Sequence, residues 1–184
     1  MRIVLKWITP PIKTFSDLDT GLLIVSKIMA FNKHVDQKML EFGLIDTLEK
    51  LTPNVVMNGE TNCQVQVCMI CVNLLASDIS VAKEFRKSKL PSLLMNFFCN
   101  NPQTRVLIEL MDCYRIFFCN GSQQEIFKFL DRNISFLEFL LKFMDPKGSK
   151  RLNITSLLVL NKILGEEKEY CKNEEIGKFL DSVY

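Results

Sequence analysis

The residues best equipped for chemistry in this sequence are cysteines. Cys68 and Cys71 form a Cys-x-x-Cys motif, and Cys63 lies five residues upstream of it. Thiols at this spacing bind zinc when two further ligands join them, and they exchange disulfides when the pair opens an exposed helix. The chain has a single histidine, His34, and the motif lies inside an apolar stretch. We therefore expect both thiols on one buried helix face, and we expect neither a metal site nor another cofactor.

Other catalytic constellations lack essential parts. With His34 alone the chain cannot form a histidine pair, and a catalytic triad would have to be built around a residue in a polar turn. Lys147-Gly148-Ser149-Lys150 resembles the end of a phosphate-binding loop, but the required earlier glycine and the preceding strand are missing. The acidic pairs at 166–167 and 174–175 are typical of helix starts, where carboxylates complement the helix dipole. We expect that the protein is not an enzyme.

Composition and charge narrow the function classes further. The 184 residues are 48% hydrophobic and 24% charged, as in soluble globular proteins. The net charge of +2 is far from the basic stripe of a nucleic-acid binder, so a nucleic-acid partner is not expected. The longest apolar runs are broken well short of the ~20 residues of a transmembrane segment, and the first residues lack the apolar core of a secretory signal. With seven cysteines, an odd number, these features predict an intracellular protein, cytoplasmic or nuclear.

Helix signals fill the sequence and must position any functional side chain. Ser16 with Asp19 and Thr61 with Gln64 have N-cap spacing, and Asn101-Pro102 offers a cap followed by proline. Turn signals stand at Thr52-Pro53-Asn54 and at 58–59, 120–121 and 145–148. The predicted helices span 16–30, 33–41, 44–51, 61–76, 79–87, 90–99, 102–118, 123–131, 134–144, 150–164 and 174–183.

A junction between helices recurs four times along the chain. Its first apolar residues are Leu44, Leu90, Ile134 and Ile176, so successive junctions lie 46, 44 and 42 residues apart. A period in this range is typical of a helical solenoid. Each period holds a short, a medium and a long helix. The long helix at 61–76 is apolar on nearly every face, which predicts that it is buried between neighbours.

A period near 42 residues with three unequal helices resembles the armadillo repeat, with the HEAT repeat as a close relative. The stretch MICVNLLAS at 69–77 looks like the family's small-Leu-x-Asn-Leu pattern, with Asn73 in the asparagine position. The resemblance implies an all-α fold, a right-handed α-solenoid of about four armadillo-like repeats that is incomplete at both ends. Residues 1–184 would then form a single domain with repeat junctions near 44, 90, 134 and 176.

The resemblance also implies a binding groove. In armadillo proteins the asparagine column lines the concave face and holds the backbone of an extended peptide; the equivalent positions here are Lys27, Asn73, Arg115 and Asn161. Import receptors of this family place a tryptophan four residues before each asparagine, where this chain has Leu23, Met69, Met111 and Leu157. The expected partner is therefore a protein or peptide of some acidic character, and not a lysine-rich localisation peptide. The alternative is that the four residues merely cover the helix surface.

The family's glycine between its first two helices is matched only by Gly43, while Lys89, Asn133 and Glu175 stand at the other junctions. A sharp corner at these points favours the left-handed backbone conformation. Glycine adopts it freely and asparagine tolerates it, whereas lysine and glutamate tolerate it less well.

Basic residues cluster at two corresponding turns. The candidate edge consists of Arg86, Lys87 and Lys89 in one turn and of Lys147, Lys150 and Arg151 in another. Corresponding turns of a solenoid lie on one edge, so the two clusters could form a patch for an acidic protein, an anionic lipid surface or RNA. The alternative is an ordinary solvated edge.

These features predict a non-catalytic scaffold or adaptor that binds a partner segment along the groove formed by the long helices at 16–30, 61–76, 102–118 and 150–164. The alternative is a structural subunit, or a fragment of a larger armadillo-repeat protein, that packs through its lateral or end faces. The apolar residues in 1–8 could form a partial helix over the first long helix. The charged residues after 165 could cap the other end.

Overall fold

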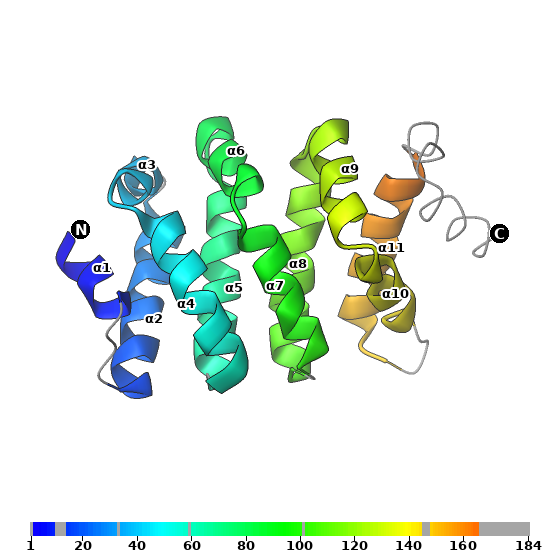
Figure 1. The fold of residues 1–184 in the computed structure, drawn as a ribbon. Helices are drawn as coiled ribbons and strands as arrows, with labels where there is room; N and C mark the ends of the chain where they lie inside the picture. Colours follow the sequence, from blue (N-terminus) through cyan, green and yellow to red (C-terminus); the bar gives the residue numbers. More distant parts are fainter. Residues whose placement is uncertain are drawn as a thin grey trace. The chain divides into compact units, whose positions relative to one another are not determined.

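The computed structural model of the chain describes residues 2–9, 14–32, 34–58, 60–100, 102–144 and 148–165. Within these ranges it contains eleven helices and no strand (Figure 1). The helices are α1 (Arg2–Ile8), α2 (Phe15–Phe31), α3 (His34–Glu41), α4 (Leu44–Asn58), α5 (Thr61–Leu75), α6 (Ile79–Lys87), α7 (Leu90–Cys99), α8 (Thr104–Asn120), α9 (Gln123–Arg132), α10 (Ser135–Lys142) and α11 (Lys150–Gly165). The predicted all-α class is confirmed. None of the described helices is long and apolar enough to cross a membrane.

The chain divides into two compact units, Met1–Cys113 (unit 1) and Tyr114–Tyr184 (unit 2). In unit 1 the triplet α2, α3 and α4 is followed by the triplet α5, α6 and α7. Each helix of the first triplet packs beside its counterpart in the second, α2 with α5, α3 with α6 and α4 with α7. The predicted junction residues Leu44 and Leu90 are the first residues of α4 and α7. The sequence period between these two junctions therefore coincides with a packing period.

The long helix α5 is buried on most of its surface, as its apolar sequence predicts. Nine of its fifteen residues are buried, including Val67, Cys68, Ile70 and Cys71, and α5 packs against α2, α4 and α6. The predicted partial helix at the start of the chain is also present: it is α1, and it packs on α2. The approach is close at Gly21, where an added Cβ would lie 2.9 Å from Ile8 Cγ2.

Two predicted boundaries are wrong. The turn at Thr52-Pro53-Asn54 does not exist, because α4 runs through Pro53 to Asn58. Val55 and Val56 beyond the proline are buried, and this burial outweighs the backbone hydrogen bond that proline cannot donate. The cap at Ser16 is replaced by Thr14, whose Oγ1 accepts a hydrogen bond from the Asp17 backbone N–H at 3.1 Å.

Other predicted starts differ in smaller ways. Helix α5 begins at Thr61 itself, with Glu60 in the N-cap position. Helix α8 begins at Thr104, two residues after Pro102, and Asn101 lies outside the described residues. The predicted helix at 174–183 and the junction at Ile176 also lie outside them.

The corners between helices differ in backbone conformation. Gly43 has a φ of +79°, the left-handed conformation that the resemblance implies. Lys89 is right-handed helical (φ −82°, ψ −11°) and Asn133 is also at negative φ (−137°). At the Lys89 corner, Ser88 is extended and its Oγ accepts a hydrogen bond from the Leu90 backbone N–H at 3.2 Å. A serine therefore supports the start of α7 without a left-handed residue; Glu175 lies outside the described residues.

Unit 2 is built around an aromatic cluster. The rings of Tyr114 and Phe118 at the end of α8 lie against Phe129 of α9 and Phe136 of α10, with ring centroids 4.7–5.8 Å apart. The start of α9 carries a capping box, in which Ser122 and Glu125 bond each other's backbone N–H groups. Helix α11 packs against α10 and buries Val159 and Ile163.

Candidate functional site

Two members of the predicted groove column lie on neighbouring helices of unit 1. Lys27 is exposed on α2 and Asn73 is half-buried on α5, and these helices pack side by side (Figure 1). One turn earlier on each helix lie Leu23, which is 40% exposed, and Met69, which is half-buried. We call these four residues the α2–α5 face.

Hydrogen bonds join the two helices at this face. The Asn73 side-chain amide donates to the Ser26 carbonyl oxygen at 3.1 Å. Beneath it, the Ser26 hydroxyl donates to Gln66 Oε1 at 2.6 Å, and both of these residues are buried. A buried hydrogen-bonded pair fixes one relative position of two helices, because any shift would leave a polar atom without a partner. Asn73 thus stabilises the helix pair in addition to any contact with a ligand.

The α2–α5 face still offers polar groups to a partner. Among the described residues, Lys27 has no ion pair and nothing donates a hydrogen bond to the Asn73 amide oxygen. An ammonium group attracts carboxylates, and an amide oxygen accepts from a peptide N–H. The apolar atoms of Leu23 and Met69 beside them add contact area. This combination suits an extended peptide that carries acidic side chains.

The other two members of the column belong to unit 2. Arg115 is half-buried on α8, and Asn161 is exposed on α11. Lys27 and Asn73 belong to unit 1, whereas Arg115 and Asn161 belong to unit 2. A continuous column of these four residues therefore remains a prediction from the sequence.

The first cluster of the candidate basic edge lies among carboxylates. Lys87 Nζ is 3.6 Å from Glu84 Oε1, and the Lys89 backbone N–H donates to Glu49 Oε1 at 2.7 Å. Arg86 is half-buried on the same helix, α6. In unit 2, Lys150 and Arg151 are exposed at the start of α11, and Lys147 lies outside the described residues. The local charge near Lys87 is therefore mixed, which the linear sequence does not reveal.

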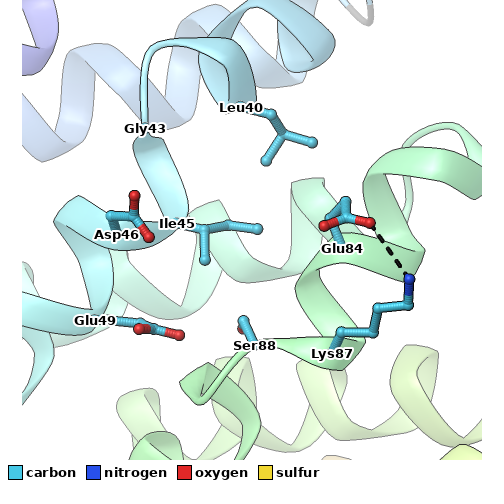
Figure 2. Close-up of a pocket in the computed structure, with 8 residues that line it drawn as sticks. All are labelled: Leu40, Gly43, Ile45, Asp46, Glu49, Glu84, Lys87 and Ser88. Carbon is cyan, nitrogen blue, oxygen red and sulfur yellow. Dashed lines mark ion pairs between the residues drawn. The ribbon is translucent and has the colours of Figure 1, made fainter.

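The same carboxylates line a hollow that is not predicted from the sequence. Figure 2 shows the residues that line it, at the α3–α4 corner and the end of α6. Its volume is about 350 Å³. Its lining residues are Leu40, Gly43, Ile45, Asp46, Glu49, Glu84, Lys87 and Ser88. Its lining includes three carboxylates, Asp46, Glu49 and Glu84, and one ammonium group, that of Lys87, so the lining carries a net negative charge. Asp46 and Glu49 come from α4 and Glu84 from the next triplet, and only the stacking of the triplets brings them together.

The cysteines at the centre of unit 1 are buried thiols, as predicted. Cys68, Cys71 and Cys113 are at most 1% exposed, and no described cysteine forms a disulfide. Burial raises the pKa of Cys68 well above its ordinary value, and a hydrogen bond with Cys71 followed by burial does the same to the pKa of Cys113. The thiols of Cys68 and Cys113 are therefore held in the protonated, unreactive form. Among the described residues, no group of three or more metal-binding side chains is arranged to hold an ion.

No protein-family model matches this chain, and no curated protein sequence matches it either.

Proposed function

We propose that the chain is an armadillo-like α-solenoid that acts as a non-catalytic protein-interaction scaffold and binds an extended partner segment. The observation that supports this most strongly is the packing of α2, α3 and α4 beside α5, α6 and α7 in unit 1. Stacked triplets in which each repeat contacts its neighbours are the organising feature of solenoids. Solenoids present extended surfaces, and such surfaces bind other chains.

Three hydrogen bonds within unit 1 join residues that are separated by nearly the same number of positions in the sequence. Ser26 bonds Gln66 and Lys89 bonds Glu49, each 40 residues apart, and Arg105 bonds Asn62, 43 residues apart. These separations are close to one repeat, as they should be when contacts join successive copies of one structural unit. The links are of different chemical types, so they reflect the stacking and not a repeated side-chain motif.

The proposed binding surface is the α2–α5 face. The peptide backbone would bond the free side of the Asn73 amide, and an acidic side chain of the partner would lie near Lys27. Without a tryptophan at the positions of Leu23 and Met69, the surface has no aromatic slots for lysine stems. The proposal therefore names an extended, acidic segment as the partner. Free cysteines agree with a location inside the cell, in the cytoplasm or nucleus.

Selection from a random peptide library tests this function. Peptides that bind the chain should be enriched in acidic residues, and their binding should slow hydrogen exchange in α2 and α5. Protection confined to α3, α4, α6 and α7, or selected peptides rich in lysine, would contradict the proposal. Repeating the selection in high salt checks the electrostatic part, because salt screens exposed charges.

A structural subunit is the second candidate function. It is favoured by the exposed apolar residues Ile154, Leu157 and Leu158 on α11, since such residues often mark a protein interface. An obligate subunit studied alone should self-associate or aggregate. Sedimentation of the isolated chain over a range of concentrations separates the two candidates, because a scaffold should stay monodisperse.

A further inference from the structure

A polar hollow lies where α5 and α8 begin. It has a volume of about 470 Å³ and is lined by Glu60, Thr61, Asn62, Gln103 and Arg105, all of them in unit 1. Each of these side chains carries a hydrogen-bonding group, and none of them is apolar. The hollow therefore suits a polar or charged group of a ligand and not an apolar side chain.

Arg105 supplies hydrogen-bond donors to this hollow. Its side chain is exposed, and its Nη1 donates to Asn62 Oδ1 at 3.4 Å, which is a long hydrogen bond. Among the described residues it forms no ion pair. A guanidinium group carries five N–H donors in a planar fork that matches a carboxylate. Arg105 can therefore bind a carboxylate and keep its contact with Asn62.

Glu60 limits what the hollow can bind. It occupies the N-cap position of α5, and its side chain makes no capping hydrogen bond. An ionised carboxylate only accepts hydrogen bonds, so Glu60 suits a backbone N–H of a ligand and repels a second acidic group. The hollow thus matches one acidic side chain together with the backbone beside it.

The hollow lies on the same side of α5 as the α2–α5 face. Asn62, Met69 and Asn73 have the spacing i, i+7 and i+11, which places them in one stripe of the helix. Lys27 is at the Asn73 end of this stripe, because its neighbour Ser26 bonds Asn73. Eleven residues of helix span roughly 16 Å, and an extended chain covers that distance in about five residues. A segment that bonds Asn73 can therefore reach the hollow.

Carboxylates lie beside the part of α5 between these two points. Burial is the largest cause of the raised pKa values of Cys63 and Cys68, and the charge of Asp19 on α2 adds to the first and that of Glu109 on α8 to the second. Both carboxylates are half-buried, and both belong to unit 1. They would repel an acidic residue in the middle of a bound segment.

We propose that Arg105 binds a second acidic side chain of the segment that occupies the α2–α5 face, at least five residues from the acidic side chain that lies near Lys27. The inference rests on the proposed function, because it describes the same segment. It adds a rule for the partner sequence: two acidic residues at this separation, with uncharged or basic residues between them. It also gives the hydrogen bond between Arg105 and Asn62 the role of orienting the guanidinium group.

Substitutions at Arg105 test the contact with library-selected acidic peptides. The peptides are amidated at the C-terminus, so only their side-chain carboxylates respond. Arg105→Gln in the full chain should weaken binding about fivefold, and Arg105→Lys, which keeps the charge, should weaken it less. Lys83→Gln on the exposed surface of α6 is the control and should bind like the parent chain. Equal weakening in Arg105→Gln and Lys83→Gln would overturn the proposal.

A double-mutant cycle identifies the acidic residue that contacts Arg105. Each acidic residue of the peptide is changed to its amide, and the effect is measured on the parent chain, on Arg105→Gln and on Lys27→Gln. One acidic residue should lose its effect in Arg105→Gln, and another, at least five positions away, should lose its effect in Lys27→Gln. If only Lys27→Gln weakens binding, or if both variants couple to the same acidic residue, the inference is wrong and the proposed function stands. If neither variant weakens binding, the proposed function fails as well.

Discussion

The Asn73 side-chain amide on α5 donates a hydrogen bond to the Ser26 carbonyl oxygen on α2, 3.1 Å away. The residue that the armadillo resemblance places in a peptide groove is thus also part of the contact between two stacked helices. Replacing Asn73 would change both stability and any binding. Lys27, which has no ion pair among the described residues, is the better position for a binding test.

Loss of the Ser26 hydroxyl should destabilise the α2–α5 pair. Ser26→Ala leaves Gln66 Oε1 buried without its donor, and an unsatisfied buried acceptor costs about 1–3 kcal/mol. Urea unfolding measures the change. Ser80→Ala on the exposed surface of α6 is the matched control and should be nearly neutral.

A double variant separates the contribution of the hydrogen bond to stability from the contribution of packing at the same site. In Ser26→Ala with Gln66→Met, the acceptor is removed together with its donor, so part of the lost stability should return. If the double variant is as unstable as the sum of the two single changes, the polar pair does not hold the helices together.

Substitution of Gly43 should weaken the α3–α4 corner. Gly43→Ala forces a residue with a Cβ to keep a φ of +79°, at a cost of roughly 1–2 kcal/mol. Space is not the cause, because the new Cβ would meet only Asp46 Oδ2, at 3.9 Å. Thermal unfolding of Gly43→Ala and Gly43→Asn checks this. Asparagine tolerates the left-handed region, so Gly43→Asn should lose less; equal losses would argue against a left-handed corner.

Stability should fall at alkaline pH in a way that depends on Cys63. Burial, followed by the charges of Asp19 and Glu60, raises the pKa of Cys63 from 9.0 to about 11. Between these values the unfolded chain releases a proton that the folded chain keeps, so the free energy of unfolding decreases as the pH rises from about 9 to about 11. Below pH 9 this contribution is fully present.

Urea unfolding at pH 8 and pH 10.5 measures the effect. Other groups titrate in the same range, so the comparison is with Cys63→Ala, which should lose less stability over the interval than the parent chain. An identical loss in both proteins would show that the Cys63 thiol is not shielded from solvent.

The sequence predicts the helices well because apolar spacing and burial agree at most positions. Leu44 and Leu90 are fully buried first residues of their helices, so the pattern that identifies them also anchors them. Pro53 is the exception, because its local signal for a turn competes with the burial of Val55 and Val56 further along α4. A turn signal in the sequence therefore fails to predict a turn where the residues on both sides of it are strongly buried.

Contacts between the two helix triplets of unit 1 are harder to predict. Nothing local to Ser26 or Asn73 shows that they meet, since 47 positions separate them. The hollow beside Gly43 is not predictable from the order of charges along the chain, because Glu49 contacts the Lys89 backbone only when the two triplets pack together. The spacing of the junctions predicts which helices of unit 1 are neighbours, but not which side chains form hydrogen bonds between them.

The most direct test of the central claim is the affinity of a library-selected acidic peptide for the Lys27→Glu variant. Reversal of an exposed charge at the contact should weaken binding by about fivefold, equivalent to ~1 kcal/mol, and added salt should reduce the difference. Lys50→Glu on the exposed surface of α4 is the control and should bind like the parent chain. Unchanged affinity of Lys27→Glu, or equal weakening in Lys50→Glu, would contradict binding at the α2–α5 face.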